Sequence, residues 1–259
     1  MPELPEVEIF RRYFDETALN QKISKVHVLH PKVVETPSIV EEIEGHSFES
    51  TQRWGKNLFV HTSGGKTLNM HFGMTGYLEY YHHSLEIPKY ARVVFDFESD
   101  YHLGYISKRM FGRIGLIESI ETYTKDKGLA GDAMQIELAS FKNNVLKRKK
   151  NVKAVLLDQG TAAGVGNWIA DEILFQSRIH PTIPSQSLAD EQIDTIYSHM
   201  QGIIQTAIDT QSVREDLPPH YITKYGRKTT ITCPNCGNNI EKTVVAGRGT
   251  YACETCQHA

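Results

Sequence analysis

All four cysteines of the chain lie near its carboxyl end, in two CxxC pairs. Each CxxC turn can present two thiolates to one tetrahedral Zn²⁺, and four sulfurs leave the ion no open position for catalysis. Two disulfides are the alternative, but a reducing compartment disfavours them. We therefore predict one structural zinc ion in a zinc finger over residues 223–259. The expected ligands are Cys233, Cys236, Cys253 and Cys256.

The segment between the two cysteine pairs predicts a β-hairpin over residues 244–251, with the tip at residues 246–249. A metal-fixed hairpin would hold Arg248 forward on a rigid ribbon, where the guanidinium group is well placed to bind phosphate. Many zinc ribbons serve only folding or protein contacts, so the zinc finger alone does not identify a function.

Short segments with alternating apolar residues dominate the first half of the chain and predict β-strands. The expected strands cover residues 22–30, 48–54, 57–62, 67–72, 92–98 and 102–107. They follow a first helix whose apolar stripe is Val7, Phe10 and Phe14. Several short strands at this spacing are typical of an antiparallel sandwich, which we place in a first domain over residues 1–125.

Helical periodicity replaces the alternation after about residue 131 and predicts a second domain over residues 132–222. The expected helices lie near residues 138–146, 152–159, 168–176 and 188–208. Ser187 and Asp190 are the expected capping pair of the longest helix. The fold class is therefore α+β and multi-domain, with an N-terminal helix and antiparallel β-sandwich, a helical domain and a C-terminal four-cysteine zinc finger.

A turn at residues 164–167 precedes the third of these helices and places Asn167 at its N-cap. Free backbone N–H groups at a helix N-terminus bind anions, although a plain capped turn between two helices explains the pattern equally well.

The net charge of -3 argues against a nucleic-acid partner, but its distribution is uneven. Residues 142–153 contain no acidic residue and six basic ones, among them Arg148 and Lys153. Arg227 and Arg248 add basic residues near the carboxyl end. A solvated helix face is the ordinary explanation for the first cluster. No run of eighteen apolar residues is present, so we expect a soluble, cytoplasmic protein without a membrane partner.

The first residues, Met1-Pro2-Glu3-Leu4-Pro5, contain a nucleophile if the initiator methionine is removed. Pro2 would then carry a secondary amine that is partly unprotonated at neutral pH, and Glu3 could serve as its general acid or base. Ordinary helix-start chemistry is the alternative, because Pro5 and acidic residues favour the first turn of a helix.

The run of residues 2–8, PELPEVE, resembles the amino terminus of the formamidopyrimidine-DNA glycosylase family. The resemblance continues through residues 156–181, which look like the family's helix-two-turn-helix, and through the zinc finger. It is closest to the bacterial type, with some features of the plant-type branch. It implies that Pro2 is the nucleophile, that Glu3 is its acid/base partner, and that Asn167 contacts DNA phosphate. It also implies that Arg248 binds the phosphate beside the lesion and acts in a second elimination step.

The resemblance implies further DNA-binding residues in the first domain. Lys56, which we place on a strand edge and count among the catalytic residues, would reach the phosphates around the lesion, and His71 also matches a family motif. Three side chains would fill the gap left by an everted nucleotide, with the arginine bonding the orphaned base: Met74, Arg109 and Phe111. The remaining expected DNA-binding residues are Tyr90, Arg148, Lys153 and Arg227.

The function implied by the resemblance is a base-excision-repair DNA glycosylase with abasic-site lyase activity. Its partner would be double-stranded DNA with damaged bases or abasic sites, and we expect a nucleoid-associated monomer. The stretch 209–221 is shorter than the family's glycine-rich loop, which predicts good activity on formamidopyrimidines and hydantoins and weaker activity on 8-oxoguanine. The alternatives are an endonuclease VIII-like enzyme for oxidised pyrimidines and a non-enzymatic damaged-DNA-binding protein.

Overall fold

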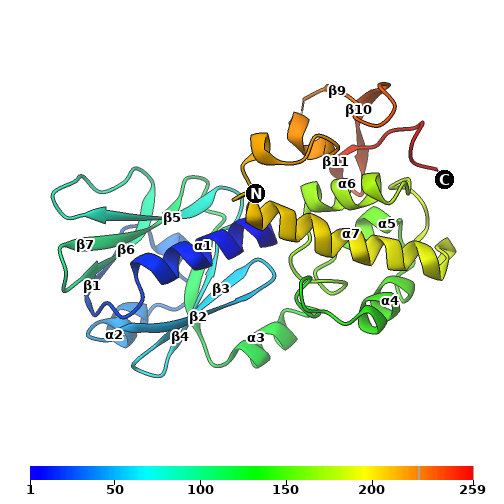
Figure 1. Ribbon diagram of the computed structural model, residues 1–259. Helices are drawn as coiled ribbons and strands as arrows, with labels where there is room; N and C mark the ends of the chain where they lie inside the picture. The colour runs from blue at the N-terminus through cyan, green and yellow to red at the C-terminus, as the bar shows by residue number, and fades with distance from the viewer. Residues whose placement is uncertain (227, 259) are drawn as a thin grey trace. The chain divides into compact units, whose positions relative to one another are not determined.

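The computed structural model describes residues 1–226 and 228–258 (Figure 1). The chain forms two compact units, each with its own hydrophobic core. Unit 1 contains Met1–Pro2 and Glu6–Lys127, and unit 2 contains Glu3–Pro5 and Gly128–Ala259.

Unit 1 is an antiparallel β-sandwich with short helices. One sheet has the strand order β1-β6-β7-β5, and the other has the order β2-β3-β4-β8. The strands are β1 (Ile23–Val28), β2 (Phe48–Trp54), β3 (Asn57–Thr62), β4 (Thr67–His71), β5 (Gly76–His82), β6 (Ala91–Phe97), β7 (Tyr101–Ser107) and β8 (Arg113–Ile117). The helices are α1 (Leu4–Thr17), α2 (Ile39–Ile43) and α3 (Ile120–Asp126).

One core fills the sandwich, because both sheets and α1 turn apolar side chains inward. Phe95 of β6 and Leu58 of β3 are fully buried in it. The predicted apolar stripe of the first helix is confirmed, since Val7 and Phe14 are fully buried and Phe10 packs against the same cluster. Burial along the strands is less regular than a strict alternation, since β3 and β4 each carry four buried residues in a row.

The sequence prediction omits strands β5 and β8, as well as α2 and α3. β5 carries buried side chains on both of its faces, Leu78 and Tyr81, so its period-two signal is lost. β8 has only five residues, and Gly115 lies so close to a neighbouring loop that a Cβ atom there would be 3.0 Å from the Cβ of Glu35. Glycine has a low propensity for β-strands, so the sequence of β8 does not indicate a strand.

Unit 2 contains the helices α4 (Leu138–Leu146), α5 (Val152–Leu157), α6 (Asn167–Gln176) and α7 (Asp190–Asp209). The predicted stripe of the longest helix is confirmed, with these residues buried: Ile193, Ile196, Met200, Ile203, Ile204 and Ala207. The predicted capping pair of α7 is wrong. Ser187 ends a short 3-10 helix, and α7 instead begins after Ala189, whose backbone N–H donates to Oε1 of Gln192 at 2.9 Å.

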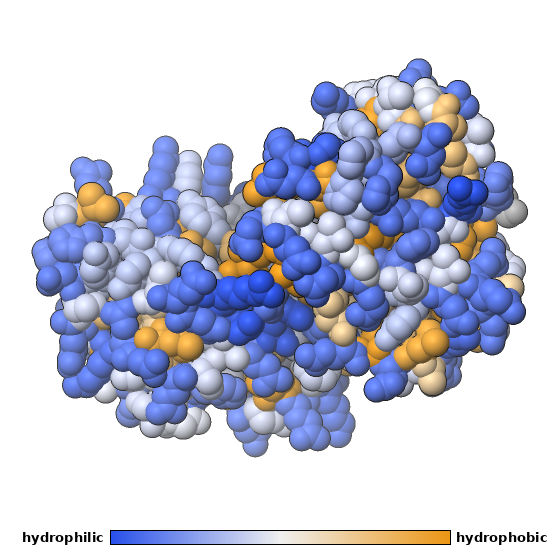
Figure 2. Space-filling view, in the orientation of Figure 1, coloured by the Kyte–Doolittle hydropathy of each residue, from blue (hydrophilic) through white to orange (hydrophobic). Residues whose placement is uncertain are grey.

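The zinc finger adds a three-stranded antiparallel sheet of order β11-β10-β9 to unit 2. Its strands are β9 (Thr230–Thr232), β10 (Asn239–Val245) and β11 (Arg248–Tyr251). In the space-filling view, hydrophilic side chains cover most of the visible surface and apolar ones form small separate patches (Figure 2). Among the described residues, no helix combines the length and apolar character needed to span a membrane.

Candidate active site

Glu3 is fixed by the N-terminus of α6. The Glu3 side chain is buried, with only 3% of the residue exposed. Its Oε1 accepts the backbone N–H of Trp168 at 3.1 Å, and its Oε2 accepts that of Ile169 at 3.2 Å. The partial positive charge of the helix end favours a carboxylate at this position. Pro2, directly before it in the chain, is partly exposed.

Two glycines make room for this arrangement. A Cβ atom at Gly166 would lie 2.1 Å from Cδ of Glu3, and one at Gly164 would lie 2.5 Å from Cδ1 of Leu4. Gly164 also has a φ of +114°, and its carbonyl accepts the backbone N–H of Leu4 at 3.2 Å. Glu3 and Leu4 therefore pack tightly against the turn at residues 164–166.

This geometry corrects the predicted anion site at Asn167. The N-cap of α6 is Gly166, and Asn167 is the first residue of the helix. The backbone N–H groups that follow it are occupied by the chain's own anion, the carboxylate of Glu3. The side-chain amide of Asn167 donates to the carbonyl of Gly249 at 2.9 Å and so holds the hairpin of the zinc finger.

Lys153 is a buried structural residue, which corrects its assignment to a DNA-contacting surface. It is 0% exposed, and its Nζ donates to Oδ1 of Asp171 at 2.6 Å and to Oγ1 of Thr250 at 2.6 Å. It also donates to the carbonyl of Gly249 at 3.3 Å. A buried ammonium group needs such partners, because burial without them costs several kcal/mol. The lysine thus ties α5 to α6 and to β11.

Arg148 lies in a similar structural setting. Its Nε donates to Oδ2 of Asp158 at 2.8 Å, and its Nη1 donates to the carbonyl of Asn144 at 2.9 Å. Nearby, Nζ of Lys142 lies 2.8 Å from Oδ1 of Asp194. The basic run predicted from the sequence is therefore partly neutralised within unit 2. The predicted DNA-binding residue Arg227 lies outside the described residues.

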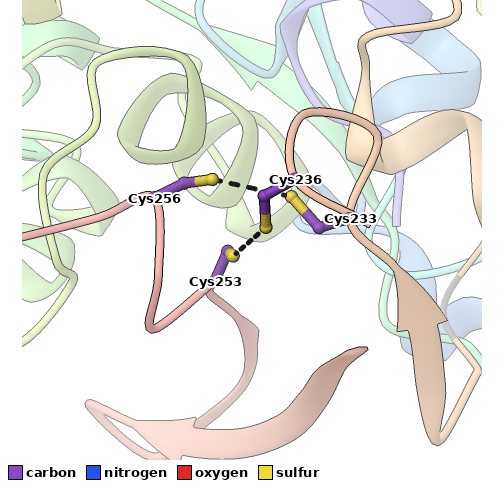
Figure 3. Close-up of side chains that lie close together, drawn as sticks. All are labelled: Cys233, Cys236, Cys253 and Cys256. Atoms are coloured by element: carbon purple, nitrogen blue, oxygen red, sulfur yellow. Dashed lines mark hydrogen bonds between the residues drawn. The ribbon is translucent and has the colours of Figure 1, made fainter. Parts of the chain in front are cut away.

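The four cysteines come together at one point, as Figure 3 shows. All four sulfur atoms lie within 4.8 Å of one another, with 3.9 Å between Cys233 and Cys256 and 3.6 Å between Cys236 and Cys253. A tetrahedral ion with Zn–S bonds of about 2.3 Å requires S–S separations of about 3.8 Å. A disulfide bond requires about 2.05 Å. The thiolates therefore fit one structural Zn²⁺ and not two disulfides.

The zinc finger presents Arg248 at the tip of its hairpin. Ala246 and Gly247 form the two-residue turn between β10 and β11, and both have positive φ values, 52° and 69°. Arg248 is the first residue of β11, pairs with Val245 in the ladder and is exposed. The fixed turn leaves the guanidinium group directed to solvent, where it can bind an anion.

In unit 1, Lys56 and His71 belong to one electropositive cluster. Lys56 lies in the two-residue turn between β2 and β3, not on a strand as predicted. Burial lowers the pKa of His71 to about 4, and the charges of Lys56, Arg113 and Lys127 contribute to this shift. His71 is therefore neutral at pH 7. Its Nδ1 accepts the backbone N–H of Gly73 at 3.2 Å, so the proton lies on Nε2, which can donate to a phosphate oxygen.

The loops that carry Met74 and Phe111 pack against each other through their backbones. A Cβ atom at Gly73 would lie 2.4 Å from the carbonyl carbon of Phe111, so only glycine allows this approach. Phe111 is 51% exposed, and the guanidinium carbon of Arg109 lies 5.1 Å from the centroid of its ring. Met74 is partly exposed. The fold thus presents the three predicted gap-filling side chains on two adjoining loops.

Tyr90 is surrounded by cations that the sequence analysis did not single out. Lys89, Arg92 and Lys108 place their charged groups 5.3, 5.7 and 5.6 Å from the centroid of its ring. Tyr90 has a φ of 71°, and its carbonyl accepts the backbone N–H of Ser107. Two of these cations lie within two residues of Tyr90 and were visible in the sequence. Lys108 joins them only through the pairing of the strands.

Three family models match the chain, each over a different part. The model of the formamidopyrimidine-DNA glycosylase N-terminal domain matches residues 1–114, and that of the H2TH domain of the same enzymes matches residues 128–216. A zinc finger found in FPG and IleRS matches residues 231–259. Together with the cysteine cluster, this match confirms the predicted site for one structural zinc ion.

Relatives and solved structures resemble the chain over its whole length. The formamidopyrimidine-DNA glycosylases of Bacillus subtilis and Ligilactobacillus salivarius are 33% and 32% identical to it, over 99% of each chain. A Lactococcus lactis formamidopyrimidine-DNA glycosylase mutant in complex with Fapy-dG DNA has a TM-score of 0.90 at 29% identity, over 100% of both chains. Another structure of that enzyme, bound to DNA with an abasic site, has a TM-score of 0.89 at 27% identity and covers 99% of this chain and 100% of its own.

These matches confirm the predicted α+β fold with its helical domain and zinc finger. They extend over both units and agree with the motif at the N-terminus. The chain therefore belongs to the formamidopyrimidine-DNA glycosylase family, the DNA glycosylases of base-excision repair.

Proposed function

We propose that the protein is a bifunctional DNA glycosylase and abasic-site lyase that acts on damaged double-stranded DNA, with Pro2 as its nucleophile. The observation that carries the proposal is the placement of Glu3. Its carboxylate is buried, held by two backbone N–H groups of α6, and adjacent in sequence to Pro2. A fixed carboxylate beside an amine is suited to proton transfer during attack by that amine. Since DNA is the substrate, the protein would work at the nucleoid.

The reaction begins once Met1 has been removed. The secondary amine of Pro2 attacks C1′ of an everted nucleotide, the bond from C1′ to the base breaks, and Glu3 passes the proton released by the amine to the departing base. The C1′–O4′ bond then opens, O4′ takes up a proton from solvent, and the resulting iminium between Pro2 and C1′ acidifies the hydrogens on C2′. Loss of one of them expels the 3′ phosphate by β-elimination, and a second elimination expels the 5′ phosphate.

The DNA contacts follow from the charged and exposed groups of each unit. In unit 1, Lys56 and the Nε2–H of neutral His71 would bind phosphates. Tyr90 and its three neighbouring cations would add to this binding surface. Three side chains would occupy the space left by the everted nucleotide: Met74, Arg109 and Phe111.

Unit 2 would add contacts from two residues near the zinc finger. Arg248, exposed at the hairpin tip, would bind a phosphate beside the lesion and assist the second elimination. Asn167 donates one amide hydrogen to Gly249, and the second hydrogen of that amide would reach a phosphate oxygen. The hydrogen bond from Asn167 would also fix the hairpin that carries Arg248.

The lesion preference would depend on the segment between α7 and the zinc finger. This segment folds into two short 3-10 helices, Arg214–Asp216 and Ile222–Tyr225. Thr223 anchors it, because its backbone N–H and its hydroxyl both donate to Oε2 of buried Glu172, at 2.9 and 2.7 Å. An anchored segment with two consecutive prolines is poorly suited to fold over a purine. We therefore propose good activity on formamidopyrimidines and hydantoins and weaker activity on 8-oxoguanine.

Structures of the Lactococcus lactis enzyme with DNA that contains Fapy-dG or an oxidised pyrimidine support the proposed activity on formamidopyrimidines and hydantoins. Single-turnover excision from matched duplexes that differ only in the lesion tests the proposal. A Glu3→Gln variant should excise Fapy-dG at least about 100-fold more slowly than the wild type while still binding the duplex. Binding without any excision by the wild type would favour a non-enzymatic damage-binding protein. Equal rates on 8-oxoguanine and a hydantoin would refute the lesion preference.

A further inference from the structure

Four of the twelve histidines of the chain gather on one sheet of unit 1, and none of the four is among the residues assigned to DNA. They are His27 on β1, His82 and His83 at the end of β5, and His102 on β7. Asp100 joins this group just before β7 begins. The side chains of His82, His83 and Asp100 each offer one ligand atom, and these three atoms all lie within 4.8 Å of one another.

The backbone of two paired strands fixes this arrangement. His82 and Tyr101 are opposite each other in the ladder between β5 and β7. At the next position, the backbone N–H of His83 donates to the carbonyl of Asp100 at 2.8 Å. Nδ1 of His83 lies 3.5 Å from Oδ1 of Asp100. His83 and Asp100 therefore lie just beyond the ends of β5 and β7, and this backbone hydrogen bond continues the strand pairing to them.

The His82 ring is also oriented by its neighbours. Nδ1 of His82 lies 2.8 Å from Oγ of Ser84, and a ring N–H at this position can donate to the hydroxyl, which leaves Nε2 as the ligand atom. Its ring stacks on that of His83, with 4.4 Å between centroids, and Tyr101 packs edge-on at 5.2 Å. Metal-binding histidines are commonly oriented by hydrogen bonds of this kind.

An ion could enter this site from solvent and keep water ligands. His83 is 52% exposed and Asp100 is 75% exposed, as measured on their side chains. His83 also lines a cavity of about 160 Å³, in which Asp96 lies 2.7 Å from Nε2 of His27 and 2.8 Å from Nδ1 of His102. The oxygens of Asp96 are thus engaged by histidines, and Asp100 is the carboxylate available to a cation at His82 and His83.

We propose that His82, His83 and Asp100 bind one divalent transition-metal ion, of the class of Ni²⁺, Cu²⁺ or Zn²⁺, with water completing its coordination. Imidazole nitrogens suit these ions, whereas Mg²⁺ and Ca²⁺ require oxygen ligands. The site is separate from the four cysteines, which take up their own zinc ion with sulfur ligands. The two sites therefore differ in ligand chemistry and can be loaded independently.

Calorimetric titration of the zinc-loaded full chain with Ni²⁺ tests this proposal. The wild type should bind one Ni²⁺ in addition to its retained zinc, which metal analysis of the recovered protein would verify. The double variant His82→Gln/His83→Gln should lose this binding, and Ser84→Ala should weaken it by about tenfold. His220→Gln removes an exposed histidine outside the patch and should bind Ni²⁺ like the wild type.

Several results would overturn the proposal. These are the absence of Ni²⁺ binding, uptake of Ni²⁺ only with loss of an equal amount of zinc, and unchanged affinity in the double variant. Mg²⁺ should produce no binding under the same conditions, and Mg²⁺ binding that depends on the same histidines would contradict the ligand chemistry. Circular dichroism of each variant establishes that a loss of binding does not reflect unfolding.

Discussion

Replacing Gly166 with alanine tests how closely the fold positions Glu3. A Cβ atom at Gly166 would lie 2.1 Å from Cδ of Glu3 and 2.4 and 2.5 Å from its two oxygens, whereas ordinary contact begins at 3.4 Å. The carboxylate must therefore move by roughly 1 Å or more, a distance that matters for a catalytic group. The φ and ψ of Gly166, -124° and -160°, are extended and open to alanine. The contact alone would cause the displacement.

The displacement would break the hydrogen bonds from Trp168 and Ile169 to Glu3. Such charge-assisted bonds contribute about 1.5–3 kcal/mol each, but the Glu3 carboxylate would regain hydration as it moves. We expect the free energy of unfolding to fall by about 1–3 kcal/mol. A displacement of about 1 Å in a catalytic group can reduce the rate about 100-fold, so we expect excision to slow by about that factor.

Single-turnover excision of Fapy-dG by the Gly166→Ala variant measures this effect, with zinc content and thermal unfolding recorded in parallel. Gly202→Ala in α7 is the matched control, because a Cβ atom there has no neighbour within 4 Å. It should leave the rate unchanged and stabilise the protein by about 0.4–1 kcal/mol. A Gly166→Ala rate within about twofold of the wild type would refute the role of this contact in positioning Glu3.

Three further predictions concern other parts of the fold. Lys153→Met should lower the free energy of urea unfolding by about 3–5 kcal/mol, because it leaves the buried Asp171 carboxylate without its ammonium partner. Lys149→Met, at an exposed position, is the control and should change this free energy by less than about 0.5 kcal/mol. Equal effects of the two substitutions would contradict this. The pKa of His71 is about 4 in the folded protein, so as pH falls from 6.5 the histidine of the unfolded chain is protonated before that of the folded chain. The free energy of unfolding should therefore fall by about 1–3 kcal/mol between pH 6.5 and about pH 4. His71→Asn should lessen this pH dependence, and an identical profile would argue against a buried neutral histidine. Phe111→Ala should reduce the rate of excision from duplex DNA by about tenfold or more. Because the ring is half-exposed, the free energy of unfolding should stay within about 0.5 kcal/mol of the wild type. A large loss of stability would show instead that the ring serves packing.

Features encoded by neighbouring residues were predictable from the sequence. The spacing of the cysteines indicated the zinc site, because the two CxxC turns each bring a pair of sulfurs together locally. The strands β2 and β3 and the apolar stripe of α7 followed from periodicities of two and of about 3.6 residues. In each case the residues that form the pattern are close to one another in the sequence.

Features that depend on residues far apart in the chain were not predictable in this way. Lys153 looked like part of a solvated basic run, but its partners Asp171 and Thr250 lie 18 and 97 residues away. The N–H groups of α6 looked free for a ligand, but Glu3 occupies them from 165 and 166 residues away. No local pattern reports such pairings, so only the folded structure distinguishes a buried ion pair from a surface charge.

The identity of the nucleophile is tested most directly by borohydride trapping on duplex DNA with an abasic site. Intact-mass analysis should first show that the protein begins at Pro2. The reduced adduct should then map to the N-terminal peptide with the DNA remnant on the Pro2 nitrogen, and trapping should fall in Pro2→Gly, in which a primary amine retains part of the reactivity. An adduct on an internal lysine, or undiminished trapping by protein that keeps Met1, would contradict the proline-amine mechanism.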